Sequence, residues 1–336
     1  MRAGRYLGEK MIEVEELEVP TLHEGEVLLQ VSYAGICGTD MMIYYGKHPR
    51  AKAPLVMGHE FSGVIVSMNG DIPFQLGERV VVEPTLHCGN CDACLAGQTQ
   101  VCRTLRLIGI DYHGGFAEYV KVPFQRLHRI PKELSDSHAA VTEPLAVAVH
   151  TVRRSNLKVG DNAVILGGGP IGLLIGLVAR EAGAGQIIVS DISPYRLEKA
   201  RELGFTVVDA KKENVCEVVA TLTNKVGADV VFEVAGTQIT AKQMIETIRT
   251  QGQIVVVSLF KQPPSVDLAA MHFREISLMT TRCYSRADFQ TAIQFMANGR
   301  IDVSPIISHE LSLEQIAEGF ILMENPDDSL KVLIKP

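Results

Sequence analysis

Short apolar runs separated by Gly, Pro and Asn characterise the first 130 or so residues of the chain. The runs at 26–31, 61–66 and 79–82 are rich in Val, Leu and Ile, which are residues that favour β-strands. The pattern therefore predicts a small, irregular, β-rich body with long loops in this part of the chain.

From about residue 162 the pattern changes to apolar runs that alternate with helical segments. Helices are predicted over 170–182 and 194–203, and buried strands at 163–166, 186–190, 206–208, 228–233, 253–257 and 276–279. Strands and helices that alternate in this way predict a doubly wound α/β fold, a parallel sheet covered on both faces. A further strand at 330–334 has no place in a finished six-stranded sheet, so we expect it to return to the first domain.

A chain of 336 residues is longer than one hydrophobic core usually serves, which favours two domains. We expect residues 1–148 and 286–336 to form the β-rich domain and residues 149–285 to form the α/β domain. A net charge of −7 argues against nucleic acid or an anionic membrane surface as the main partner.

No membrane span or secretory signal is apparent in the sequence. The uncharged stretch 163–179 is short and has Gly167, Gly168, Gly169 and Pro170 in its first half, so a strand, a turn and a helix explain it better than a membrane span. The first nine residues lack the apolar core of a signal peptide. We therefore expect a cytoplasmic protein.

A glycine-rich turn follows the first strand of the α/β region and fits the pattern G-x-G-x-x-G. Its first glycine permits a tight turn, its second lets the backbone approach a pyrophosphate, and its third lets helix and strand pack closely. The N-terminus of the following helix offers free N–H groups to the phosphates. A plain connecting turn is the alternative, but the strand before and the helix after favour a dinucleotide site. The positions concerned are Gly167, Gly169, Pro170, Ile171 and Gly172.

Asp191 stands at the end of the second strand, 19 residues after Gly172. An acidic residue at this position accepts hydrogen bonds from the adenosine ribose and repels a 2′-phosphate, which predicts NAD rather than NADP. Arg196 would weaken this preference if its side chain reached over the ribose.

Four cysteines, Cys88, Cys91, Cys94 and Cys102, give the spacing C-x2-C-x2-C-x7-C. Four thiolates suit a tetrahedral Zn²⁺ ion and leave no open position for a substrate, so the spacing predicts a structural zinc site. A redox C-x-x-C pair and simply reduced thiols are the alternatives. The intervening loop is rich in Gly and polar residues, and a metal would supply the energy that orders it.

Three further segments are unremarkable alone: the Cys37 segment 35–40, the pair His59 and Glu60 after Gly58, and the Glu143 segment 142–146. Taken in order with the cysteine cluster and the α/β region, they resemble the zinc-containing medium-chain dehydrogenases. The resemblance covers nearly the whole chain and looks closest to the branch with sorbitol, threonine and 2,3-butanediol dehydrogenases. It implies a GroES-like catalytic domain, a Rossmann NAD-binding domain and two zinc ions per chain, one catalytic and one structural.

Carried over to this sequence, the resemblance implies that Cys37, His59 and Glu60 bind the catalytic zinc. Glu143 would be a fourth ligand or the partner of a zinc-bound water, and Asp40 would fix the far nitrogen of His59. Zinc would act as a Lewis acid on a secondary alcohol (a polyol, sugar acid or diol), and NAD would take the hydride to give the ketone.

The resemblance also assigns roles around the substrate and the cofactor. Thr39 lies where the family keeps the hydroxyl that takes the alcohol proton. Where many relatives continue this relay with a His, the sequence has Met42, so the proton would leave through water, Tyr44 or His48. Ser258, by its backbone, and Arg282 would lie near the nicotinamide.

Relatives of this kind form homodimers or homotetramers, often through the last Rossmann strand, and we expect the same here. Two other function classes are open. One is a zinc-stabilised nucleotide-binding sensor without catalysis, which would hold one zinc per chain. The other is a zinc-independent quinone or alkene reductase of the same superfamily, whose activity would survive chelation.

Overall fold

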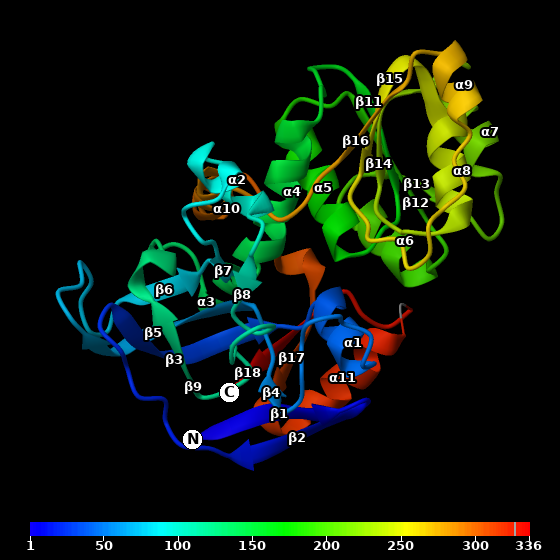
Figure 1. Cartoon of the computed structure of the whole chain (residues 1–336). Coiled ribbons are helices and arrows are strands. Elements are labelled where there is room, and N and C mark those ends of the chain that lie inside the picture. Colours follow the sequence, from blue (N-terminus) through cyan, green and yellow to red (C-terminus); the bar gives the residue numbers. More distant parts are fainter. Residues whose placement is uncertain (326) are drawn as a thin grey trace. The chain divides into compact units, whose positions relative to one another are not determined.

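In the computed structural model, which describes residues 1–325 and 327–336, the chain divides into two units, each built from more than one segment (Figure 1). Unit 1 contains Met1–Glu143, Ser285–Asn325 and Lys331–Pro336, and unit 2 contains Pro144–Tyr284 with residues 327–330. The sequence pattern puts the first boundary after residue 148. The structural boundary lies inside helix α4 (Thr142–Arg154), where no loop marks it.

Unit 1 is built around a seven-stranded sheet with the order β10-β6-β5-β3-β18-β17, in which β9 also pairs with β3. A three-stranded sheet, β2-β1-β4, and the pair β7-β8 complete it. Its strands are β1 (Arg2–Gly8), β2 (Met11–Glu16), β3 (Glu26–Gly35), β4 (Leu55–Val56), β5 (Glu60–Asn69), β6 (Arg79–Val82), β7 (Thr85–Leu86), β8 (Arg106–Leu107), β9 (Tyr119–Pro123), β10 (Leu127–Arg129), β17 (Ile307–Ser312) and β18 (Lys331–Lys335).

Short helices connect these strands, as expected for a β-rich body with long loops. They are α1 (Gly38–Tyr44), α2 (Asp92–Leu95), α3 (Asp136–Ala140), α10 (Arg286–Ala297) and α11 (Ile316–Glu324), with 3₁₀ turns at Thr99–Val101, Phe124–Arg126, Ser304–Ile306 and Leu313–Gln315. In β3, Val27, Leu29 and Val31 alternate inward and are almost fully buried, so one face of the strand supplies core.

The C-terminal strand returns to unit 1, as the sequence predicts. β18 pairs antiparallel with β3, with Ile334 opposite Ala34, and parallel with β17. Figure 1 shows the red end of the chain beside the blue β3. The last residues of the chain therefore contribute to the same sheet as residues 26–35.

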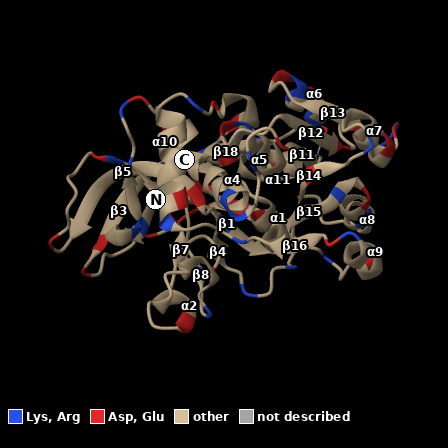
Figure 2. Ribbon diagram, turned by 90° about the horizontal axis from the view of Figure 1, so that it is seen from above, with Lys and Arg blue, Asp and Glu red and all other residues tan. Residues whose placement is uncertain are grey.

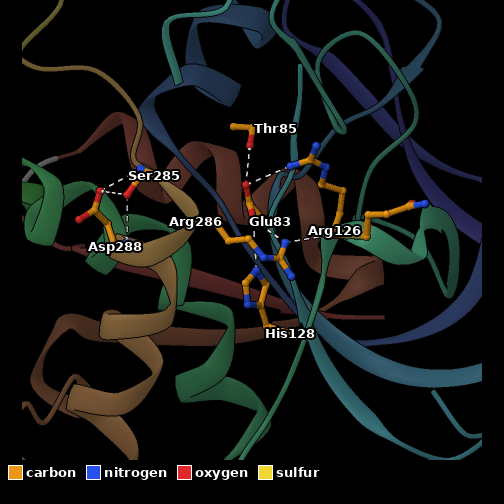
Figure 3. Close-up of polar contacts among 8 residues, drawn as sticks. Glu83, Thr85, Arg126, His128, Ser285, Arg286 and Asp288 are labelled. Carbon is orange, nitrogen blue, oxygen red and sulfur yellow. Dashed lines mark hydrogen bonds and ion pairs between the residues drawn. The ribbon is translucent and has the colours of Figure 1, made fainter. Parts of the chain in front are cut away.

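A buried carboxylate ties the returning helix α10 to the N-terminal sheet (Figure 3). Glu83, just after β6, accepts hydrogen bonds from Arg126 at 3.2 Å and Arg286 at 3.2 Å, and its Oε2 lies 3.1 Å from His128 Nε2. The Thr85 hydroxyl donates to the same carboxylate at 3.1 Å. Because Arg286 is the first residue of α10, this cluster fixes the point at which the chain re-enters unit 1.

Unit 2 has the doubly wound α/β fold that the alternating pattern predicts. Its strands are β11 (Asn162–Leu166), β12 (Gln186–Asp191), β13 (Thr206–Asp209), β14 (Ala228–Glu233), β15 (Ile248–Val256) and β16 (Ser277–Thr280), and its helices are α5 (Pro170–Glu181), α6 (Pro194–Glu202), α7 (Val215–Leu222), α8 (Gln238–Thr247) and α9 (Leu268–Phe273). All six strands are parallel, in the order β13-β12-β11-β14-β15-β16.

The sheet of unit 2 is buried because helices cover it. Val164, Leu166 and Ile188 on the strands pack with Met244 and Val219 on α8 and α7 in one apolar cluster. Acidic and basic residues are interspersed on the outer surface, for example along α6, where Lys199 pairs with Glu202 (Figure 2). No helix in the described parts of the chain has the length and apolarity needed to span a membrane.

Candidate functional site

Three predicted metal ligands of unit 1 lie together. One donor atom each from Cys37, His59 and Glu60 falls within 4.8 Å of the others. Strand pairing explains this, because Gly35 at the end of β3 lies opposite Glu60 at the start of β5. Cys37 follows β3 by two residues and His59 precedes β5, so the register of two neighbouring strands assembles a sulfur, a nitrogen and an oxygen donor.

The surroundings of His59 favour a positive charge. Asp40 is fully buried, its Oδ1 lies 3.4 Å from His59 Nδ1, and its Oδ2 accepts the N–H of Cys37 at 2.9 Å. Burial by itself lowers the pKa of His59, but the adjacent Asp40 and Cys37 raise that pKa well above its usual value. Asp40 next to Nδ1 leaves Nε2 as the ring nitrogen for a metal.

A buried lysine that the sequence analysis missed completes this site. Lys331 Nζ donates to Glu60 Oε2 at 2.6 Å and to the carbonyl oxygen of Ile36 at 3.1 Å. Burial lowers the pKa of Lys331, but Glu60 and Cys37 outweigh it and raise that pKa, so the ammonium stays charged. A Cβ on Gly35 would lie 2.4 Å from Glu60 Oε2, so this close approach needs glycine.

This donor set fits Zn²⁺, which binds Cys, His and carboxylate ligands and keeps an open position at catalytic sites. Lys331 occupies only part of the hydrogen-bonding capacity of Glu60, so the carboxylate keeps lone pairs for a metal. Glu143 is buried, yet it is not part of the group of three whose donor atoms lie within 4.8 Å. The structure therefore brings three of the four predicted ligands together.

The candidate relay residues differ in their surroundings. Thr39 is half-buried on α1, and Met42 is half-buried one turn later. Tyr44 is buried, and its ring packs against Phe320 with 4.9 Å between ring centres. His48 is partly buried, and its Nδ1 accepts the N–H of Ala51 at 3.0 Å.

The four clustered cysteines also lie within 4.8 Å of one another. Cys88 Sγ is 3.9 Å from Cys94 Sγ and 3.6 Å from Cys102 Sγ, and Cys91 Sγ is 4.0 Å from Cys102 Sγ. Four sulfurs around tetrahedral zinc, each about 2.3 Å from the ion, are about 3.8 Å apart. Backbone N–H groups of Asn90 and Cys91 lower the pKa of the Cys88 thiol to about 6. The spacing and the chemistry of this cluster fit zinc with four protein ligands.

The glycine turn of unit 2 has the geometry that its sequence predicts. It joins β11 to α5, and Pro170 occupies the first turn of that helix. A Cβ on Gly172 would lie 1.9 Å from the carbonyl oxygen of Gly167, so only glycine permits this close approach. Ile171 follows in the first turn of α5 and is half-buried.

Asp191 lies under this turn. Its Oδ2 accepts the N–H of Gly168 at 2.6 Å, and its Oδ1 accepts the N–H groups of Ile192 and Ser193 at 2.7 and 2.8 Å. The Arg196 guanidinium is also near the turn, since a Cβ on Gly169 would be 3.7 Å from its NH1 atom. An acidic and a basic group therefore both border the glycine turn.

The remaining predicted cofactor residues lie after β15 and β16. The Ser258 hydroxyl donates to the carboxylate of Glu233, a buried residue that the sequence analysis did not single out. Arg282 is exposed, two residues beyond the end of β16. The only sign of Glu233 in the sequence is that an acidic residue ends the apolar run predicted to be the strand 228–233.

Comparisons with known proteins agree with this arrangement. Residues 23–132 match the family model described as alcohol dehydrogenase GroES-like domain, and residues 170–298 match that of a zinc-binding dehydrogenase. The chain is 40% identical to a 2-dehydro-3-deoxy-L-galactonate 5-dehydrogenase from Pseudoalteromonas atlantica, over 100% of this chain and 98% of the relative.

Two solved structures share the whole fold. One is a 2R,3R-butanediol dehydrogenase from Bacillus subtilis, with a TM-score of 0.93, 32% identity, and coverage of 100% of this chain and 99% of that chain. The other is described as a putative zinc-binding dehydrogenase from Sinorhizobium meliloti bound to NADP, with a TM-score of 0.94, 33% identity and the same coverage.

Proposed function

Because the chain belongs to the zinc-binding dehydrogenases with an alcohol dehydrogenase GroES-like domain, we propose that it oxidises a secondary alcohol to a ketone with NAD. The observation that carries this proposal is the group formed by Cys37, His59 and Glu60. A structural zinc is held by four protein ligands, whereas a site with three protein ligands leaves one coordination position open for an alcohol substrate.

Zinc held by these residues would act as a Lewis acid toward the alcohol, and NAD would accept the hydride. Asp40 holds the ring of His59 in place through Nδ1, and Lys331 restrains Glu60. In this proposal, Glu143 would complete the metal site, either as a fourth ligand or as the partner of a water bound there.

The hydroxyl of Thr39 takes the proton of the alcohol. Of the candidate groups that could pass this proton on to solvent, His48 fits best. Tyr44 packs into the core beside Phe320, whereas His48 is near enough to Asp40 and His59 to interact with their charges. Burial and the Arg50 charge lower the pKa of His48, which keeps its ring neutral near pH 7. Replacing His48 by Gln should lower kcat and leave the zinc content unchanged; an unchanged kcat would point to an exit through water.

The four-cysteine cluster binds the second, structural zinc. Its sulfur spacing and its four protein ligands support a closed site without an open position. Thiolate ligands persist in a reducing compartment, which agrees with the cytoplasmic location expected from the sequence.

NAD is the preferred cofactor in this proposal. The Asp191 carboxylate is held beneath the glycine turn by three backbone N–H groups, and its charge opposes a ribose 2′-phosphate. Arg196 pairs with the phosphates instead of with Asp191, because its guanidinium lies beside Gly169.

The substrate is a sugar acid or another polyhydroxylated compound. The relative with 40% identity is a dehydrogenase of a deoxy sugar acid, and the butanediol dehydrogenase shows that the same fold also serves a diol. The working form is a homo-oligomer that pairs β16, an edge strand of its sheet. Leu278 on β16 and Phe273 and Leu268 on α9 are 42%, 83% and 70% exposed, which gives a second copy apolar surface to cover.

The deciding experiment is an NAD-reduction screen over sugar acids, polyols, diols and threonine, with zinc analysis of the same preparation. We expect two zinc ions per chain, a response to sugar acids or polyols, and loss of activity on chelation. Cys37→Ser should lose one zinc and its turnover yet still bind NADH, while Cys216→Ser, far from either cluster in sequence, should keep both. One zinc per chain without turnover would favour a sensor, and activity that survives chelation would favour a zinc-independent reductase.

A further inference from the structure

Glu233 ends strand β14 and is completely buried. Its Oε1 accepts hydrogen bonds from the N–H groups of Ala235 at 3.1 Å and Gly236 at 2.7 Å, and from the Thr240 hydroxyl at 2.7 Å. Its Oε2 accepts the Ser258 hydroxyl. In the described parts of the chain, these four partners of the Glu233 carboxylate, two backbone N–H groups and two hydroxyl groups, are all neutral donors and none is a cation.

A buried carboxylate without a cation is costly unless hydrogen bonds satisfy it, so four donors around one carboxyl group indicate a built arrangement. Three of the donors come from two separate loops, and the fourth, Thr240, lies in the first turn of α8. Ala235 and Gly236 belong to the loop between β14 and α8, and Ser258 belongs to the loop after β15. The main chain adds to this link, because the Glu233 carbonyl oxygen accepts the N–H of Val257 at 2.9 Å.

These loops lie at the point in the sheet where ligands bind. β11 and β14 are neighbours in the centre of the strand order, and the order reverses between them. In doubly wound sheets, a dinucleotide lies across the carboxyl ends of the strands at this point. A Cβ on Gly167 would be 3.1 Å from the backbone nitrogen of Ala235, so the first loop borders the glycine turn directly.

The position of the loops after β14 and β15 also indicates which half of a bound dinucleotide they would contact. Asp191, which in the proposed function binds the adenosine ribose, lies on β12, which pairs with β11 on the side away from β14. The pyrophosphate would lie at the turn itself. The ends of β14 and β15 therefore face the half beyond the pyrophosphate, which carries the nicotinamide.

We propose that Glu233 is a positioning residue for the nicotinamide half of the cofactor, because it fixes the two loops on which that half rests. This inference depends on the proposed function only in requiring a nicotinamide dinucleotide as cofactor. Without the Glu233 carboxylate, the two loops would have no common hydrogen-bond acceptor to order them in the free protein. Cofactor binding would then have to order them, and the entropy cost of this ordering weakens binding. The adenosine half, held by the glycine turn and Asp191, does not depend on the carboxylate.

The test compares two ligands that differ in the nicotinamide alone. Dissociation constants for NADH and for ADP-ribose are measured by calorimetry on the zinc-loaded protein and on Glu233→Ala, together with the emission spectrum of bound NADH. We expect NADH to bind about tenfold more weakly or worse, with a less enhanced emission, while ADP-ribose binding stays within about twofold. Glu233→Gln should recover most of the NADH affinity, because its amide oxygen accepts as Oε1 does and its amide nitrogen can donate to Ser258.

A matched control lies at the opposite end of the same strand. The Asp229 carboxylate accepts the N–H of Asn162 at 2.8 Å and pairs with Arg249, far from the carboxyl ends of the strands. Asp229→Asn should lower the melting temperature without changing the ratio of the two dissociation constants. If Glu233→Ala does not fold, Ser258→Ala removes one loop from the carboxylate and should give the same selective loss.

Equal weakening of both ligands, or no weakening of either, would overturn the role of Glu233. Wild-type protein that binds neither ligand would contradict the proposed function itself. The two failures are therefore distinguishable in one set of titrations.

Discussion

Asp191 is the single side chain to which the proposed preference for NAD is assigned. Its carboxylate accepts three backbone N–H groups at 2.6, 2.7 and 2.8 Å and is only 9% exposed. These bonds fix the carboxylate beside the glycine turn, where, in the proposed function, it would accept a ribose hydroxyl and repel a 2′-phosphate.

Asp191→Ala should therefore weaken the preference for NAD over NADP. Hydrogen bonds to a charged group contribute about 1.5–3 kcal/mol each, so the ratio of kcat/KM for NAD to that for NADP should fall by about tenfold or more. Steady-state kinetics with both cofactors provide the measurement, and Asp209→Ala, one strand away on β13, serves as the control. An unchanged ratio would mean that another residue reads the ribose.

Lys331 is a second residue whose charge affects the stability of the protein. It is 3% exposed, and its ammonium lies 2.6 Å from Glu60 in the group that also contains Cys37 and His59. Removing one partner of a buried ion pair leaves an uncompensated charge, which costs about 3–5 kcal/mol.

Lys331→Met should destabilise the chelated protein by about 3 kcal/mol and the zinc-loaded protein by less, because a nearby divalent cation offsets the charge of Glu60. Thermal melting with and without chelator measures the difference. Adding Glu60→Gln to Lys331→Met should recover part of the loss. A loss of equal size in both metal states would contradict this role.

At the scale of elements, the cluster around Glu83 joins β6, β10 and the start of α10 (Figure 3). Burial raises the pKa of Glu83, but the hydrogen bond from His128 and the charges of Arg126 and Arg286 outweigh it and lower that pKa. Burial lowers the pKa of His128, and the contact with Glu83 offsets this only in part. Both groups therefore resist protonation in the folded protein.

A lowered pKa contributes stability above the pKa of the unfolded chain and loses it as the pH falls toward the folded value. For His128 this loss begins below about pH 6.5, whereas for Glu83 it begins below about pH 4.5. The wild type should lose stability between pH 7 and pH 5 more steeply than His128→Gln, by up to about 1.4 kcal/mol per pH unit. Denaturant melts at several pH values measure both slopes, and identical slopes would show that His128 is not responsible.

At the scale of the whole molecule, the chain leaves unit 1 inside α4 and returns to it at Ser285. The sheet of unit 2 ends at β16, and no strand in the described residues pairs with the outer edge of β16. Exposed Leu278 on that strand, with Phe273 on α9, gives unit 2 an apolar edge suited to a second copy of the chain.

Leu278→Lys should therefore yield a smaller assembly, because a buried lysine at the centre of an interface lacks a partner. Mass photometry at nanomolar concentration measures the assembly directly. Val159→Lys, which alters an apolar residue 86% exposed outside β16 and α9, should leave its size unchanged. A Leu278→Lys protein of unchanged mass would exclude this edge from the interface.

Features that depend on neighbours in the chain could be predicted from the sequence. The spacing of Cys88, Cys91, Cys94 and Cys102 predicts a sulfur cluster, and the structure brings the four thiols together. The six strands of unit 2 and the glycine turn between β11 and α5 are confirmed, because periodicity and turn chemistry act within a few residues. The grouping of Cys37 with His59 was reached through family resemblance, since neither segment is distinctive alone.

Only the tertiary structure could reveal the partners of the buried charges. Lys331 and Glu60 form an ion pair although they are 271 positions apart in the sequence, and Arg286 and Glu83 do so although they are 203 positions apart. Both contacts arise because the C-terminal segments rejoin the N-terminal sheet, with β18 in a fixed register against β3. A pattern along the chain determines which residues form a strand, but the packing of all strands together decides which side chains meet across them.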